Sequence, residues 1–206
     1  LTQPAKNSGT QTFTWDPEGH VETASDGTGT TTYTYDADGN RLLQRDPAGR
    51  TLYLPGQEIR FDSASSKKAC TRYYSHGGAT VASRTATALS WLSADAQGTG
   101  QVSVSAIGQV PTIRRQLPFG NPRGPETVWP NERGFVGGTR DNTGLTHLGA
   151  REYDAGLGRF ISLDPVMDLT DPQQIHGYTY ANNTPVTQSD PSGLDPGGGQ
   201  CADTPG

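Results

Sequence analysis

Hydrophobic residues are scarce in this chain of 206 residues, at 31% of the total, and no apolar run approaches the ~20 residues that a membrane-spanning helix needs. So low a hydrophobic content is typical of disordered chains only when the net charge is high. Here the formal net charge is −5, and aromatic residues make up an ordinary 8%. The composition therefore excludes a helical membrane protein and favours a folded chain with one large domain or two small ones.

Cysteine and histidine are also sparse. Cys70 and Cys201 lie far apart and neither belongs to a Cys-x-x-Cys pair, so we expect neither a disulfide framework nor a structural zinc site. We predict no metal ion or cofactor, because no spacing typical of metal ligands joins the four histidines, which are His20, His76, His147 and His176. An isoelectric point near 5.3 without a Lys/Arg cluster argues against nucleic acid as a partner.

Glycine and proline are plentiful, with 27 and 15 residues, which is typical of many short strands joined by turns. A repeat supports this interpretation, because residues 12–20 read TFTWDPEGH and residues 32–40 read TYTYDADGN. In both copies threonines alternate with aromatic residues, as in a strand with one aromatic face. The Asp-x-acidic-Gly sequence that follows favours a tight turn. Looser copies begin at Asp46 and Arg151, so the sequence predicts a series of β-hairpins.

The rest of the chain continues this rhythm less regularly. Residues 62–112 contain further strand-like segments, in which Val102 and Val104 alternate with serine and are expected to share one half-buried face. Residues 120–134 are rich in Pro and Gly, which predicts a loop or a subdomain boundary. The aromatic residues of the repeats could stack on carbohydrate, but a core ladder is favoured for this set, which comprises Phe13, Trp15, Tyr33 and Tyr35.

The repeat TYTYDADGNR resembles the YD repeat of the Rhs/YD-repeat superfamily, whose members include Rhs toxins, the C components of insecticidal toxin complexes and teneurins. In that family such hairpins stack into a spiralling sheet that forms a hollow shell. The physics agrees, because a lone hairpin is only marginally stable in water whereas stacked hairpins pair each other's edges. The resemblance implies a mainly β fold, a curved sheet of stacked hairpins, with further repeats of a parent shell as partners.

Residues 133–194 are similar to the Rhs repeat-associated core domain. The matching motifs are AREYD at 150–154, GRF at 158–160, Asp164-Pro165 and the closing DPSGL of residues 190–194. The resemblance implies three parts, a hairpin region over residues 1–120, a core domain over 121–194 and a flexible tail or the start of a variable effector over 195–206.

One short helix is predicted inside the core domain. The sequence Thr170-Asp171-Pro172 offers an N-cap residue and an early proline, so a helix is expected from Gln173 to about Ala181. Gly177 disfavours it.

The resemblance also implies a self-cleavage. In shell-forming relatives an aspartyl-protease-like site cuts after the DPxGL leucine, which here places the cleaved bond between Leu194 and Asp195. The carboxylates would be Asp164 and Asp190, with Arg159 as the partner of one of them. Asp168 and Asp171 are reserve candidates for the second acid. Two adjacent carboxylates suit peptide hydrolysis, because like charges at close range leave one of them protonated and the other ionised.

Several functions stay open at this point. Asp-Pro is a common turn sequence, so Asp190 could simply set the turn that presents Leu194, and whether the chain is an enzyme is undecided. The first hypothesis is a C-terminal cap of a β shell that holds and presents a C-terminal effector polypeptide. The second adds single-turnover aspartyl autoproteolysis. The third is a non-enzymatic, secreted YD-repeat module for binding or adhesion.

The family context predicts a secreted or exported protein, as part of a larger chain. The N-terminal residues show no signal-peptide pattern and no initial Met, so we expect an internal piece of a longer chain or a processed end.

Overall fold

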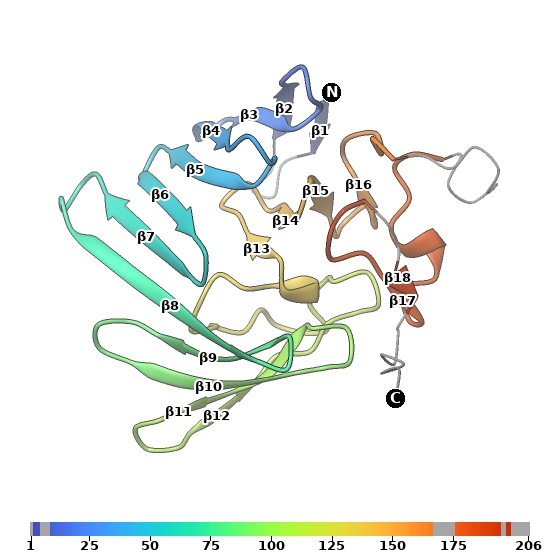
Figure 1. Cartoon of the computed structure of the whole chain (residues 1–206). Coiled ribbons are helices and arrows are strands. Elements are labelled where there is room, and N and C mark those ends of the chain that lie inside the picture. Colours follow the sequence, from blue (N-terminus) through green and yellow to red (C-terminus); the bar gives the residue numbers. More distant parts are fainter. Residues whose placement is uncertain (1, 5–8, 167–175, 195–196, 199–206) are drawn as a thin grey trace.

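The computed structural model describes residues 2–4, 9–166, 176–194 and 197–198. It contains a 12-stranded antiparallel sheet, a four-stranded sheet and a two-stranded sheet (Figure 1). In the large sheet every strand pairs with the next one along the chain, from β1 to β12. This order is that of stacked hairpins, and it confirms the mainly β fold that the repeats predict.

The strands of the large sheet are β1 (Thr2–Pro4), β2 (Thr10–Trp15), β3 (Val21–Asp26), β4 (Gly29–Tyr35), β5 (Arg41–Asp46), β6 (Gly49–Leu54), β7 (Gln57–Asp62), β8 (Lys68–His76), β9 (Ala79–Arg84), β10 (Leu89–Ala94), β11 (Gly100–Ser105) and β12 (Pro111–Ile113). The smaller sheets contain β13 (Thr139–Arg140), β14 (Thr146–Leu148), β15 (Arg151–Asp154) and β16 (Arg159–Phe160), then β17 (Gln188–Ser189) and β18 (Gly197–Gly198). Two single turns of 3-10 type are η1 (Phe135–Gly137) and η2 (Ala181–Asn183).

The repeated Asp and Gly residues build the hairpin turns. The Asp16 N–H donates to the His20 carbonyl at 2.9 Å, and the Gly19 N–H donates to the Asp16 carbonyl at 3.1 Å. The turn at Asp36 has the same two bonds at the same lengths, with Gly39 in the place of Gly19. Both glycines have positive φ, 90° and 79°, which side chains disfavour.

The threonine–aromatic alternation separates the two faces of the sheet. Phe13 and Tyr33 are buried on the concave face, where Trp15 and Tyr35 pack beside them, whereas Thr12 lies on the exposed face. The prediction of an aromatic core ladder is therefore confirmed. Val102 and Val104 also share a half-buried face, but in β11 the buried residue is Ser103 between them.

The large sheet curves around the C-terminal third of the chain, which lies on its concave side (Figure 1). Side chains of the sheet bond into that segment along its length: Gln11 to the Thr143 carbonyl, Ser83 to Asn131, Thr99 to the Val136 N–H and Gln97 to the Pro185 carbonyl. The enclosed segment has its own aromatic core, formed by Phe135, Tyr153, Phe160 and Tyr180 with Val136, Leu148 and Ala181. Residues 120–134 contain no strand, as predicted, and pair with neighbouring segments only through isolated bridges at Pro122 and Arg133.

The last repeat copy folds as a hairpin but leaves the large sheet. Its two arms are β15 and β16, with Tyr153 opposite Phe160 and the turn at Asp154. They belong to the four-stranded sheet inside the concavity.

The predicted helix is wrong where the structure describes it. Residues 173–175 lie outside the described residues, and residues 176–180 form turns and a bridge instead of a helix. Thr179 pairs with Arg159, and the Tyr178 and Gly177 carbonyls accept from the N–H groups of Phe160 and Asp164. These carbonyls bond to the neighbouring segment, so they do not serve a helix. The turn η2 that follows has positive φ at all three of its residues.

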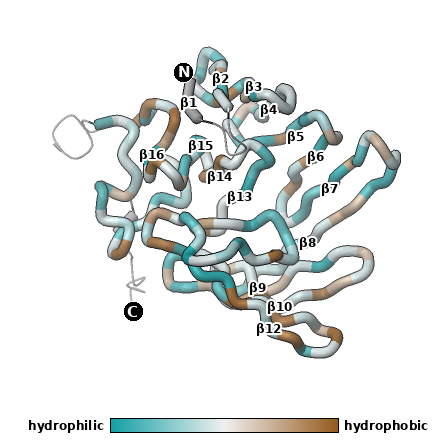
Figure 2. Tube along the Cα trace, turned by 180° about the vertical axis from the view of Figure 1, so that it is seen from behind, coloured by the Kyte–Doolittle hydropathy of each residue, from teal (hydrophilic) through white to brown (hydrophobic). Residues whose placement is uncertain are grey.

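The convex face of the sheet exposes apolar side chains at its C-terminal end. Tyr74, Trp91 and Val104 lie in one cross-strand row with the buried Ala82, and Tyr74 and Trp91 are 43% and 54% exposed. Hydrophobic residues are also prominent on the hairpins near β10 and β12 in the rear view (Figure 2). No helix within the described residues is long and apolar enough to span a membrane.

A buried charge network ties the sheet to the segment that it encloses. Arg41 of β5 donates to both carboxylate oxygens of Asp141, at 2.7 and 2.9 Å, and to Glu152 of β15 at 2.5 Å. His147 contacts the same Glu152 oxygen at 2.8 Å, and the Tyr33 ring lies 4.6 Å from the guanidinium carbon. The Arg41, Asp141 and Glu152 side chains are at most 2% exposed, so water contributes little to stabilising their charges.

Replacing Arg41 by Met should lower the free energy of unfolding by about 3–5 kcal/mol, because two buried carboxylates lose their counter-charge. Urea unfolding followed by fluorescence measures this loss. Arg45→Met is the matched control, because Arg45 lies on the exposed face of the same strand. Equal losses in the two variants would contradict a special role for Arg41.

Acid should weaken the same network. Burial raises the pKa of Glu152, but Arg41 and His147 outweigh it and lower the pKa to about 2, below the ordinary value of 4.5. A lowered pKa contributes stability above pH 4.5 that is lost as the pH falls towards 2. We therefore expect Glu152→Gln to reduce the drop in urea midpoint between pH 5.5 and pH 3. Glu22→Gln, at an exposed position of β3, should keep the full drop.

Candidate functional site

Two aspartates from separate segments meet at one guanidinium. Asp164 follows β16 and Asp190 follows β17, and Arg151 of β15 lies between them. The Arg151 Nη2 atom is 2.7 Å from Asp164 Oδ2 and 3.3 Å from Asp190 Oδ2. The two carboxylates that the sequence singles out are therefore brought to one cation.

Arg151 is held rigidly in this position. Its guanidinium carbon lies 3.8 Å from the centre of the Phe160 ring, its Nη1 donates to the Gly177 carbonyl at 3.2 Å, and its Nε donates to the Gly193 carbonyl. Burial lowers the pKa of Arg151, while the two aspartates oppose this effect. A guanidinium remains protonated at any physiological pH, so the site contains a fixed positive charge.

Arg159, the predicted partner of the carboxylates, lies elsewhere. It is exposed on β16, opposite Asp154 of β15, and among the described residues it makes no hydrogen bond or ion pair with Asp164 or Asp190. Successive residues of a strand point to opposite faces, and on β16 the inward position belongs to Phe160. The position that Arg159 was expected to fill is taken by Arg151, eight residues earlier.

Asp190 is the more enclosed of the two aspartates, with 1% of its surface exposed. Its Oδ1 atom accepts from the Ser192 hydroxyl at 3.0 Å and from the Leu194 N–H at 3.1 Å. Burial raises the pKa of Asp190, and Arg151 and Ser192 counteract part of that rise. The Asp164 side chain is 14% exposed, and its Oδ1 atom accepts from the Val166 N–H at 2.9 Å.

The DPSGL segment is held against the turn between β14 and β15. The Ala150 N–H donates to the Ser192 carbonyl at 2.9 Å. Gly149 and Gly193 permit this approach, because a Cβ atom on Gly149 would lie 2.0 Å from the Ser192 carbonyl oxygen and one on Gly193 would lie 2.4 Å from that of Leu148. Leu194 is thus fixed next to Asp190. Asp195 lies outside the described residues, as do the reserve candidates Asp168 and Asp171.

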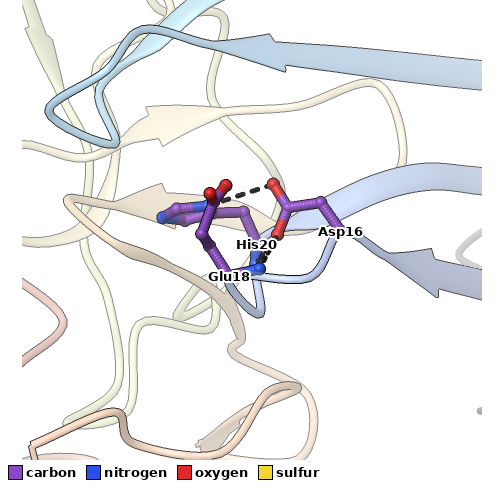
Figure 3. Close-up of side chains that lie close together, drawn as sticks. All are labelled: Asp16, Glu18 and His20. Atoms are coloured by element: carbon purple, nitrogen blue, oxygen red, sulfur yellow. Dashed lines mark hydrogen bonds and ion pairs between the residues drawn. The ribbon is translucent and has the colours of Figure 1, made fainter.

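A second cluster of potential ligands lies in the first hairpin turn. Asp16, Glu18 and His20 place one donor atom each within 4.8 Å of one another (Figure 3). The spacing of the histidines alone does not indicate this group, whereas the alternating Asp-x-Glu-x-His sequence of the turn does. Asp16 already accepts from the Glu18 and His20 N–H groups, and Asp36 makes the same bonds in a turn without histidine. The turn therefore accounts for the arrangement without a cation.

The Teneurin YD-shell family profile matches residues 7–186, most of the chain. The chain belongs to the YD-shell family. This membership agrees with the resemblance of its repeats and with the sequential order of its large sheet.

Solved structures of YD-shell proteins have the same fold. The crystal structure of TcdB2-TccC3 without its hypervariable C-terminal region matches with a TM-score of 0.76 and 22% identity, covering 89% of this chain and 10% of that one. The Tc holotoxin pore of Photorhabdus luminescens matches with a TM-score of 0.70 and 23% identity, covering 91% of this chain and 10% of that one. At such identities the likeness concerns the fold.

Curated relatives include large proteins of diverse kinds. Toxin subunit YenC1 of Yersinia entomophaga is 29% identical over 105 residues, 48% of this chain and 10% of the relative. The tRNA(Glu)-specific nuclease WapA of Bacillus subtilis subsp. natto is 41% identical over 80 residues, 36% of this chain and 3% of the relative. Salivary gland surface protein 1 of Aedes aegypti is 43% identical over 53 residues, 26% of this chain and 1% of the relative. The chain thus spans a tenth or less of these relatives.

Gly149→Ala tests the packing of the DPSGL segment. Its φ of +51° and the nearby Ser192 carbonyl both oppose a side chain, so we expect a loss of on the order of 1–3 kcal/mol in the free energy of unfolding. Urea unfolding measures the loss. Gly27→Ala is the control, because a Cβ atom there meets nothing within 4 Å. A Gly149→Ala variant as stable as this control would show that the segment is not tightly packed.

Proposed function

We propose that the chain forms the C-terminal end of a YD-repeat β shell, presents an effector polypeptide after DPSGL, and cuts itself between Leu194 and Asp195. The observation that carries the proposal is the placement of Asp164 and Asp190 on one buried Arg151, with Leu194 bonded to Asp190. Family membership supports the shell part of the proposal. In the full shell, further repeats would pair with the open edge of β1.

The arrangement suits hydrolysis by two carboxylates. One ionised aspartate removes a proton from water, and the water oxygen attacks the Leu194 carbonyl carbon. The other, protonated, aspartate delivers its proton to the Asp195 nitrogen as the C–N bond breaks. The products are a carboxylate on Leu194 and an amine on Asp195. The guanidinium between the two carboxylates favours their ionised forms, whereas burial favours the protonated form of Asp190, so one acid can be ionised while the other keeps its proton.

The geometry also explains why such a reaction would occur once. Leu194 reaches the site as part of the chain, and its N–H bonds to Asp190. The carbonyls of Ser192 and Gly193 before it accept hydrogen bonds from the Ala150 N–H and from Arg151. Covalent attachment replaces the binding of a free substrate, so proximity contributes a large share of the rate. No cofactor is required by this chemistry.

Intact mass spectrometry of the 206-residue chain after incubation between pH 4 and pH 8 tests the proposal. Wild type should lose its 12 C-terminal residues, 195–206. Asp164→Asn and Asp190→Asn should each slow the loss by about 10²–10⁴-fold, because each removes an acid–base group.

Asp26→Asn is the matched control, because Asp26 bonds to Thr28 in the turn between β3 and β4. This variant should be cut at the wild-type rate. An uncut wild type would overturn self-cleavage and leave the shell function alone. Cleavage in both site variants would move the chemistry to other residues.

A second candidate is a non-enzymatic binding or adhesion module. The exposed apolar row with Tyr74 and Trp91 on the convex face favours it, because contiguous apolar surface is typical of interaction sites. Sedimentation velocity of the uncut Asp164→Asn variant should then show concentration-dependent association that Trp91→Ser abolishes.

A further inference from the structure

Ser192 lies where the acid chemistry and the cleaved segment meet. Its hydroxyl is 3.0 Å from Asp190 Oδ1, and its Oγ atom is 3.2 Å from the Leu194 nitrogen. The Leu194 N–H also points to Asp190 Oδ1, at 3.1 Å. The three groups therefore form a closed set of hydrogen bonds on the acyl side of the bond that we propose is cut. Ser192 as a residue is exposed, so its hydroxyl is not needed to fill the core.

The two aspartates have unequal surroundings. Asp190 is 1% exposed, whereas the Asp164 side chain is 14% exposed. Arg151 is closer to Asp164, at 2.7 Å, than to Asp190, at 3.3 Å. Burial favours the neutral form of a carboxyl group, and a nearby guanidinium favours the charged form. Both differences favour the proton on Asp190.

The groups that face Asp190 come from four segments. Arg151 extends from β15, Asp164 follows β16, and Tyr180, which precedes η2, turns its buried hydroxyl towards Asp190. Ser192 and the Leu194 N–H belong to the same turn as Asp190. Of these groups, only Ser192 can be altered without changing a charge, the buried core or the backbone.

We propose that Asp190 is the acid and Asp164 the base of the self-cleavage, and that Ser192 is a positioning residue whose hydroxyl governs how readily Asp190 releases its proton. This inference rests on the proposed function. Asp164 takes a proton from the attacking water, and Asp190 gives its proton to the Asp195 nitrogen as the C–N bond breaks. Ser192 gains and loses nothing in the reaction. Its donation to Asp190 Oδ1 stabilises that carboxylate once it is ionised.

The balance of forces on Asp190 sets the direction of the expected effect. Burial raises its pKa, while Arg151, the Ser192 hydroxyl and the N–H groups of Leu194 and Gly193 lower it. Without the Ser192 hydroxyl, one of the hydrogen bonds that stabilise the ionised form of Asp190 is lost while the effect of burial remains. The pKa of Asp190 should therefore rise further.

The pH dependence of the cleavage rate in the 206-residue chain tests the proposal with Ser192→Ala and Ser192→Thr. An acid must be protonated to act, so its ionisation limits the rate on the alkaline side. Ser192→Ala should move the alkaline limb to higher pH by up to about one unit, so the rate above the limb should rise by up to about tenfold. Ser192→Thr retains a hydroxyl and should keep the wild-type profile. The acidic limb, which reports the base, should not move in either variant.

A direct titration separates this inference from the self-cleavage itself. Carboxyl ¹³C NMR can follow Asp190 in an uncut Asp164→Asn background, with serine, alanine or threonine at position 192. A higher Asp190 pKa with alanine alone supports the role of Ser192, and equal titrations overturn it. A shift of the acidic limb would overturn the assignment of acid and base. If wild type is never cut, the self-cleavage and the acid–base roles fall, and the titration alone decides the effect of Ser192 on Asp190.

Discussion

The buried guanidinium of Arg41 is the contact on which the arrangement of the molecule depends. Apolar packing of Leu145 and Ile161 against Phe13 and Tyr33 joins the curved sheet to the enclosed segment. Arg41 adds bonds to Asp141 and Glu152, and burial makes this contact obligatory, because a charge without water must be paired. The ion pairs thereby fix how β5 faces β15, where apolar contacts would tolerate a shift.

Strand β15 then transmits this constraint to the candidate site. Neighbouring residues of a strand point to opposite faces. Glu152 faces Arg41 and the hairpins, while Arg151 faces Asp164, Asp190 and the DPSGL segment. Both side chains are buried, so a displacement of β15 would disturb both sets of ion pairs. The hairpin sheet and the DPSGL segment are therefore held by two adjacent residues.

Local pattern predicts much of this structure, and long-range contact accounts for the rest. Alternating threonines and aromatic residues predict the strands, the Asp and Gly residues predict the turns, and the family motifs predict the pairing of Asp164 with Asp190. The structure is needed to show that Arg151, and not Arg159, joins the two aspartates, because this depends on which face of its strand each arginine occupies. The helix failed because carbonyls of residues 177 and 178 bond across to another segment. Arg41 lies 100 residues from Asp141, a distance over which a sequence pattern carries no information.

The sequential order of the large sheet has a consequence for how the chain folds. Each strand pairs with the next, so every hairpin closes a short loop, and the loss of chain entropy at each step is small. The bond from Arg41 to Glu152 closes a loop of 111 residues and can form only after most of the chain has been synthesised. Low contact order favours early formation of the sheet during translation, with the core added last. The carboxylates would thus come together only once the surrounding wall exists, and under the proposed self-cleavage this order would prevent premature release of the residues that follow Leu194.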